Sequence, residues 1–154
     1  FGRELDQNDY GSAISAAKDF IAHAKQLGAG DAERCEALYL QGSAIFKQRK
    51  RAAAQPVFDL ATKHCAKAGD QTLEVKSRYQ AARGAYAAGK HEDAAARFEQ
   101  LAVDHADHSY ADDSWIKAGE SWESAGEPAK ARAAYESALT KHPGGDMADE
   151  ARRR

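Results

Sequence analysis

Histidines are the residues of this 154-residue chain with the widest chemical scope, and there are six of them. His105 and His108 are three positions apart, a spacing that on one helix could turn both rings toward a common ion. A catalytic zinc site would need a third ligand, and no HExxH motif, CxxC motif or clustered carboxylates accompany the pair. Both residues also fall at an expected joint between helices. We therefore interpret them as solvated joint residues and expect neither a metal nor another cofactor.

Motifs of other catalytic classes are absent from the sequence. It contains no Gly-x-Ser-x-Gly elbow for a nucleophile and no glycine-rich loop that leads from a strand and could hold phosphate. A glycosidase needs two carboxylates that flank a cleft, whereas the acidic residues here fall at expected helix starts or on polar faces. We therefore expect no catalytic residues and no enzymatic activity.

Cys35 and Cys65 are the only cysteines. One falls near the start of an expected helix and the other near the end of the next helix, so an antiparallel hairpin would bring both to the same end. A disulfide there would close a loop of about 30 residues and stabilise the hairpin by about 3 to 4 kcal/mol. The alternative is two buried thiols that behave as small apolar side chains. The sequence leaves both states open.

The elements that must position these residues are helices. An alanine-rich composition with 12 glycines and only three prolines favours helix over strand. A helix-turn-helix pattern also recurs, because Ala13, Ala54, Ala94 and Ala131 take matching places in it and are 41, 40 and 37 residues apart. We therefore predict one domain over residues 1–154, built from repeats at 31–68, 70–106 and 109–143, a partial repeat at 1–27 and the start of another at 146–154.

Residues 109–143 show the repeated pattern most clearly. Gly119 and Ala131 are small where one helix must lie close to its partner. The motif reads Trp-x2-Ala-Gly-x2-Trp from Trp115, then Ala-x3-Tyr from Ala131, and ends with Pro143. It resembles the tetratricopeptide repeat consensus, Trp-x2-Leu-Gly-x2-Tyr, then Ala-x3-Phe, then Pro. This resemblance implies an all-α fold, a right-handed α-solenoid of antiparallel helix pairs.

Two details of the helix ends can be predicted. Asp31 is placed to N-cap a helix that runs from about Ala32 to Arg49. In the following helix, Pro56 lies a turn inside the pattern, where proline removes a backbone donor and costs about 3 kcal/mol in a true interior. We therefore expect that helix to start late, near Gln55, or to bend.

The resemblance also implies a binding surface, because the first helices of tetratricopeptide repeats line a concave groove. The residues at groove positions are Glu36, Tyr39, Ser43, Phe46, Lys47, Lys76, Tyr79, Arg83, Tyr86, Asp113, Ile116, Glu120 and Glu123. The family's carboxylate clamp uses lysine and asparagine where this chain has Tyr39 and Ser43, which argues against a chaperone-tail function.

We expect an extended peptide or protein segment to contact the aromatic and arginine side chains of this groove, since such residues are enriched at interaction hot spots. The predicted contacts are Tyr39, Phe46, Tyr79, Arg83 and Tyr86. The alternative is that Tyr39 and Tyr86 pack between repeats as core residues.

Charge and hydropathy argue against other partners. The chain has 22 Lys and Arg residues against 24 Asp and Glu residues, a net charge of −2, so no global basic excess is available to neutralise nucleic acid. No apolar stretch approaches the roughly 20 residues that a membrane span requires. We therefore expect a protein or peptide partner, no nucleic acid and no membrane span.

The joint His-Pro-Gly-Gly-Asp-Met-Ala-Asp-Glu-Ala at residues 142–151 carries a further resemblance. It is similar to joints in bacterial envelope tetratricopeptide proteins, among them Tol-Pal-associated periplasmic proteins, outer-membrane assembly lipoproteins and the superhelical region of soluble lytic transglycosylases. This resemblance implies a periplasmic or cell-envelope location, with the cytoplasm as the alternative. The expected function is a non-catalytic protein-interaction scaffold; the alternative is the non-catalytic arm of a cell-wall enzyme such as a lytic transglycosylase.

Overall fold

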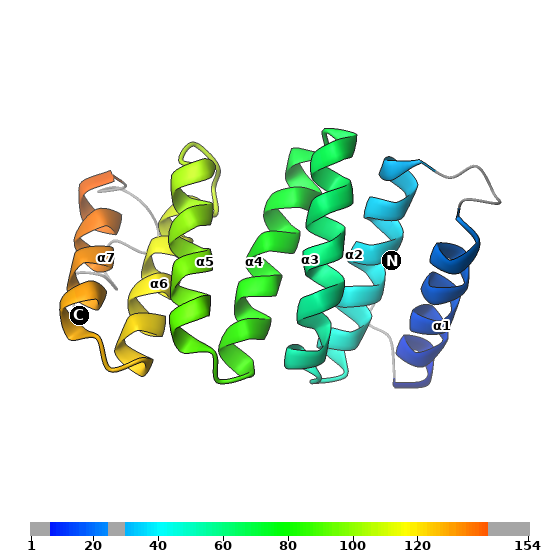
Figure 1. Ribbon diagram of the computed structural model, residues 1–154, viewed down its shortest axis with the longest axis horizontal. Coiled ribbons are helices and arrows are strands. Elements are labelled where there is room, and N and C mark those ends of the chain that lie inside the picture. Colours follow the sequence, from blue (N-terminus) through cyan, green and yellow to red (C-terminus); the bar gives the residue numbers. More distant parts are fainter. Residues whose placement is uncertain (1–6, 25–29, 142–154) are drawn as a thin grey trace. The chain divides into compact units, whose positions relative to one another are not determined.

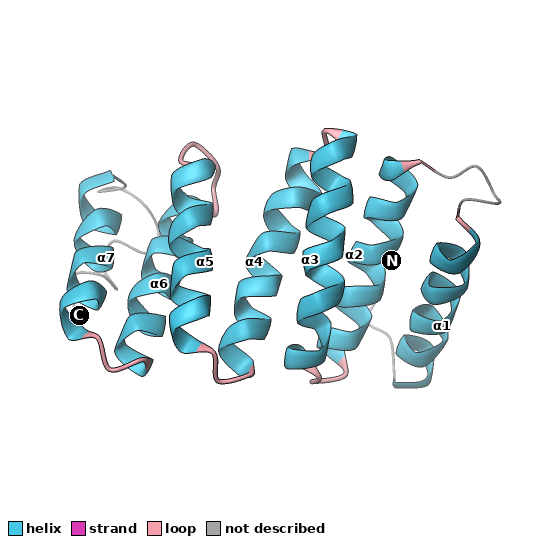
Figure 2. Ribbon diagram, in the orientation of Figure 1, coloured by secondary structure: helices cyan, strands magenta, loops and turns pink. Residues whose placement is uncertain are grey.

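The computed structural model describes residues 7–24 and 30–141. These two ranges contain seven α-helices. They are α1 (Gln7–His23), α2 (Asp31–Lys47), α3 (Arg51–Ala68), α4 (Gln71–Ala87), α5 (His91–Asp104), α6 (Ala111–Ser124) and α7 (Pro128–Lys141). No strand occurs in these two ranges, and short loops connect most of the helices (Figure 2). The prediction of an all-α fold is confirmed. The repeat expected to begin at residue 146 lies outside the described residues.

Within each half of the chain, helices that follow one another in sequence pack side by side as antiparallel neighbours (Figure 1). Helix α2 packs against both α1 and α3, and α6 packs against both α5 and α7. The chain divides into two compact units, with the boundary between Gly84 and Ala85, inside α4. We call the residues up to Gly84 unit 1 and the residues from Ala85 onward unit 2.

The turns after α2, α4 and α6 share one hydrogen-bonding pattern. Arg49, Gly89 and Gly126 each lie two residues before the next helix, with φ angles of 66°, 81° and 78°. In each turn the amide of this residue donates to the carbonyl three residues earlier, and the following amide donates to the carbonyl five residues before it. This is the Schellman arrangement that ends many helices. Arg49 therefore occupies a left-handed position that is glycine in the other two turns.

Helix α3 begins at Arg51, so of the two predicted alternatives the late start near Gln55 was wrong, and the bend stays a prediction. Pro56 lies inside the helix and is exposed. Proline has no amide hydrogen, so at this place only the helical hydrogen bond to the carbonyl four residues earlier is lost. That carbonyl is close to the helix start and accessible to water. Starting at Arg51 also allows Ala54 and Phe58 to become fully buried, which offsets the missing bond.

The core of unit 1 is centred on Phe58. This side chain is fully buried and packs with Ala54 of its own helix and Ala81 of α4. Gly42 of α2 faces the ring so closely that a Cβ atom built on it would lie 2.9 Å from Phe58 Cε1. Glycine at this position therefore allows α2 to lie against α3 at short range.

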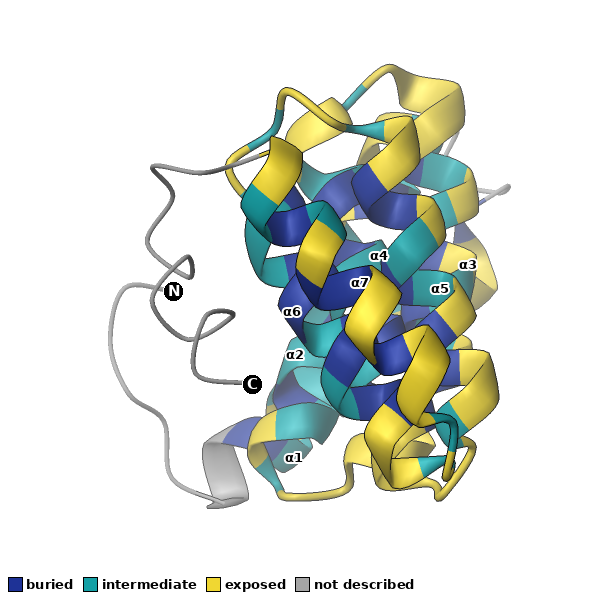
Figure 3. Cartoon of the chain, turned by 90° about the vertical axis from the view of Figure 1, so that its left-hand side faces the viewer, coloured by how far each residue is buried: buried dark blue, intermediate teal, exposed yellow. Residues whose placement is uncertain are grey.

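Unit 2 repeats this relationship between α6 and α7. Gly119 faces the ring of Tyr135, and a Cβ atom there would overlap that ring, as the sequence motif predicts. Two polar contacts secure the same region: Trp122 Nε1 donates to Glu99 Oε1 at 2.6 Å, and the Tyr135 hydroxyl donates to Glu123. Buried and exposed residues lie on different sides of these helices (Figure 3).

Candidate functional site

Unit 1 contains a pocket between α2, α3 and α4, with a volume of about 320 Å³. That volume is at the lower end of the range for ligand sites, which is about 300 to 1,000 Å³, and suits one or two side chains better than a large cofactor. The pocket is lined by Tyr39, Leu40, Ser43, Phe46, Lys47, Phe58 and Gln80. Four of these residues, Tyr39, Ser43, Phe46 and Lys47, are groove positions predicted from the sequence.

Three aromatic rings form the apolar part of the pocket. The centroids of Tyr39 and Phe58 are 5.9 Å apart, those of Phe46 and Phe58 are 6.3 Å apart, and both pairs meet edge to face. Tyr39 and Phe46 are half-buried, whereas Phe58 is fully buried. Because the two outer rings rest on a ring that is fixed in the core, their positions are set before any ligand arrives.

Cationic side chains lie around the same rings. The guanidinium carbon of Arg51, the first residue of α3, is 5.0 Å from the centroid of Phe46. That of Arg83, on α4, is 4.8 Å from the same centroid, and Arg83 Nη1 also donates to Gln80 Oε1 at 3.1 Å. Neither these two arginines nor Lys47 has a carboxylate at ion-pair distance within the described part of the chain. The pocket therefore combines an apolar interior with unneutralised positive charge.

The five predicted contact residues do not all reach this pocket. Tyr39 and Phe46 line it, and Arg83 covers one of its rings. Tyr79 is half-buried on α4 and is not among the lining residues. Tyr86 belongs to unit 2, where its hydroxyl is 2.7 Å from Ser124 Oγ and its ring packs on His91 at 4.6 Å. The structure therefore brings three of the five together in unit 1.

Two residues of the site were not among the predicted groove positions. Phe58 fills the core and forms the floor of the pocket. Arg51 begins α3 and stacks on Phe46, one of the lining rings. The signal that could have found Arg51 is the basic run at residues 47–51, where four of five residues are Lys or Arg.

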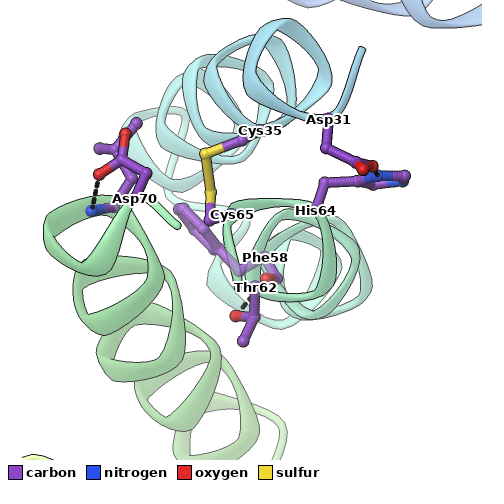
Figure 4. The surroundings of a disulfide bond; sticks show 8 residues. Asp31, Cys35, Phe58, Thr62, His64, Cys65 and Asp70 are labelled. Atoms are coloured by element: carbon purple, nitrogen blue, oxygen red, sulfur yellow. Dashed lines mark hydrogen bonds and ion pairs between the residues drawn. A yellow bond between two sulfur atoms is a disulfide. The ribbon is translucent and has the colours of Figure 1, made fainter. Parts of the chain in front are cut away.

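At the opposite end of α2 and α3, Cys35 and Cys65 form a disulfide (Figure 4). Their Cα atoms are 4.7 Å apart and both side chains are fully buried. Of the two states that the sequence left open, the structure contains the bonded one. The bridge joins the first half of α2 to the last turn of α3 and so fixes the hairpin that holds the pocket.

Beside the disulfide, Asp31 Oδ1 lies 2.8 Å from His64 Nδ1 (Figure 4). Asp31 is the first residue of α2 and not its N-cap, which corrects the prediction; the cap position is taken by Gly30, whose amide donates to Glu33 Oε2 at 3.0 Å. The hydrogen bond to His64 holds the pKa of the Asp31 carboxyl below its ordinary value, partly opposed by burial. The charges of His64, Lys67 and Arg34 act in the same direction as the hydrogen bond.

His105 and His108 lie in the joint between α5 and α6, as the sequence predicts. His108 Nδ1 accepts a hydrogen bond from the Tyr110 amide at 3.2 Å, and its ring meets that of Tyr110 at 5.3 Å. Among the residues that the structure describes, no three His, Cys, Asp or Glu side chains gather as metal ligands would. None of the helices in the described ranges combines the length and the apolar character needed to cross a bilayer.

Comparison with known families agrees with the helix pairs. Residues 79–146 match the tetratricopeptide repeat family. This match, together with the pairing of the helices, supports a tetratricopeptide repeat protein. Repeats of this family generally mediate protein–protein interaction, and the family is typically a non-catalytic scaffold. No curated protein matches the chain with significant similarity.

Proposed function

We propose that this chain is a non-catalytic scaffold that binds an extended peptide or protein segment through the first helices of its repeats. The pocket of unit 1 is the observation that supports this proposal. It opens beside Tyr39 and Phe46, two residues of a first helix that are half-buried and retain surface for a partner. Interaction hot spots typically combine aromatic side chains with a small, well-packed pocket.

The proposal extends beyond the pocket to Tyr79, Arg83 and Tyr86 on α4. All three lie on the first helix of the second repeat, and Tyr86 is 39% exposed. Tyr79 and Arg83 would offer a peptide one aromatic ring and one guanidinium, groups that bind through broad surfaces with polar edges. These two residues are the outer part of the proposed site in unit 1, the pocket is its centre, and Tyr86 stays a separate predicted contact in unit 2.

The proposal can be tested by selecting binders to the intact chain from a random peptide library and measuring their dissociation constants. We expect Phe46→Ala and the double variant Tyr79→Ala/Arg83→Ala each to weaken the selected peptides by at least about tenfold, the usual effect of removing a hot-spot contact. The matched control is Leu60→Ala, which removes an exposed apolar residue of α3 that does not line the pocket.

Thermal melting of each variant separates binding from stability. If a variant melts at a much lower temperature while its peptide affinity is unchanged, its side chain is structural and the proposed site is wrong. If peptides bind Leu60→Ala, Phe46→Ala and the unaltered chain equally well, the partner does not use the pocket.

We also infer that the protein works in an oxidising compartment, such as the periplasm or the cell envelope. The buried Cys35–Cys65 disulfide supports this inference, since disulfides persist in such compartments and are rare in the cytosol. Thiol trapping with an alkylating reagent in intact cells, followed by mass spectrometry, tests it. We expect both cysteines to escape alkylation and to be recovered as one disulfide-linked pair of peptides. Alkylation of both cysteines would point to the cytoplasm.

A further inference from the structure

The charged residues of unit 1 are unevenly distributed along its helices. No Asp or Glu occurs at residues 37–58, which include all the pocket residues of α2 and α3, or at residues 75–91, which include Gln80 of α4. The acidic residues nearest in sequence are Glu36, Asp59, Glu74 and Glu92. Glu74 is within 3.9 Å of Arg78, and Asp59 also has a partner, so neither carboxylate is available to the pocket.

Positive charge is concentrated where acidic residues are missing. Lys47 ends α2, Arg49 and Lys50 lie in the turn that follows, and Arg51 begins α3. Arg83 of α4 contacts the same Phe46 ring as Arg51. Two guanidinium groups on one ring repel each other when no anion is present. A carboxylate bound beside this ring would be attracted to both groups.

The backbone conformation of Arg49 is a separate indication that the positive charge of this turn is functional. Its φ of 66° is costly for any side chain with a Cβ atom, and the equivalent turns have Gly89 and Gly126. Strain of this kind is concentrated at functional sites. Arginine at this position adds a cation to the same turn at the expense of stability.

We propose that the pocket binds an acidic segment of a partner protein, in which one aromatic or large aliphatic side chain is flanked by Asp or Glu. This inference rests on the proposed function, since it names the class of peptide that the pocket recognises. The apolar side chain enters the space among Tyr39, Phe46 and Phe58, and the flanking carboxylates pair with Arg51 and Arg83. The cavity of about 320 Å³ has room for one such side chain.

Fluorescence polarisation with synthetic peptides tests the inference on the full chain. The first probe is a labelled ten-residue peptide with the central sequence Glu-Asp-Phe-Asp-Glu, the second replaces its acids by Gln and Asn, and the third replaces its Phe by Ala. We expect only the first to bind well, with the others at least about tenfold weaker, since charge-assisted hydrogen bonds and the apolar anchor contribute comparably. Its affinity should fall as NaCl rises from about 50 mM to about 500 mM, because salt screens exposed charges.

Variants of the chain identify the groups responsible. Arg51→Gln and Arg83→Gln should each weaken the acidic peptide about tenfold and leave the amide peptide unchanged. Arg132→Gln is the matched control, because it removes the same charge from an exposed position on α7. Circular dichroism of each variant establishes that it is folded.

Three outcomes would overturn the inference. If the amide peptide binds as tightly as the acidic one, the pocket recognises peptides without regard to charge, and only the proposed function survives. If the acidic peptide fails to bind while library-selected peptides bind in a Phe46-dependent way, the partner class is wrong but the site is right. If an oligothymidine binds more tightly than the acidic peptide and depends on the same arginines, the positive charge serves nucleic acid.

Discussion

Gly42 of α2 lies directly against Phe58 of α3, with the aromatic ring resting where a side chain on residue 42 would be. Since Phe58 is also the floor of the pocket, this contact links the packing of the hairpin to the shape of the binding site. Any atom added at position 42 must displace the ring.

Replacement of Gly42 by alanine is therefore expected to lower the free energy of unfolding by about 1 to 3 kcal/mol, the usual cost of overpacking a core. Gly11→Ala is the control, because its Cβ would meet nothing within 4 Å and alanine is favoured over glycine in a helix by about 1 kcal/mol. Urea denaturation followed by circular dichroism compares the two. Equal stabilisation by both variants would show that the ring moves aside at little cost.

The turn at Arg49 gives an opposite prediction. Arg49→Gly should raise the free energy of unfolding by about 1 to 2 kcal/mol, because glycine adopts a positive φ without the steric cost that arginine bears. Gly89→Ala, at the equivalent turn of the next repeat, should lower stability by a similar amount. If Arg49→Gly is neutral or destabilising, the arginine side chain makes compensating contacts and its backbone conformation is not a burden.

Loss of the disulfide should destabilise the α2–α3 hairpin by about 3 to 4 kcal/mol, the loop-entropy estimate for a closed loop of 30 residues. Cys35→Ala/Cys65→Ala and the unaltered chain with reductant should both show a lower urea midpoint. The reductant should have no effect on the double variant, which serves as the control. A midpoint that reductant leaves unchanged in the unaltered chain would mean that the bridge is absent in solution.

The ion pair between Asp31 and His64 predicts a loss of stability in acid. Because the pKa of Asp31 is lowered on folding from its ordinary value of 3.8, its contribution is present above that pH and disappears as the pH falls through the lower, folded value. The difference in urea midpoint between the unaltered chain and Asp31→Asn should thus shrink as the pH is lowered from about 5 to well below 3.8. Asp107→Asn, an exposed residue of the α5–α6 joint, corrects for the change in net charge. A difference that stays constant over this interval would exclude the pair as its source.

Local signals in the sequence predicted most of the fold. The helix expected from Ala32 to Arg49 is observed at Asp31–Lys47, because glycines and polar residues mark both of its ends. The close approach at Gly119 was visible because only a small residue fits there. Pro56 misled the prediction because the cost of one missing hydrogen bond is visible in the sequence, whereas the burial of Phe58 that offsets it is not.

The candidate site was only partly predictable for a similar reason. Tyr39 and Phe46 lie on one helical face, which sequence spacing reveals. Gln80 and Arg83 reach the same place from α4, more than 30 residues later, through packing that no local pattern records. The left-handed backbone of Arg49 was equally hidden, because arginine is an ordinary helix former and gives no sign of a turn.

The position of the disulfide also determines how the chain would respond to mechanical tension. Cys35 and Cys65 are 30 residues apart in sequence. Since an extended chain spans about 3.5 Å per residue, the disulfide prevents about 100 Å of chain from extending when the two ends are pulled. The pulling force passes across the sulfur–sulfur bond and bypasses the loop that it closes. Tyr39, Phe46 and Phe58 all belong to that loop, so the aromatic part of the pocket would carry no load while the rest of the chain is stretched.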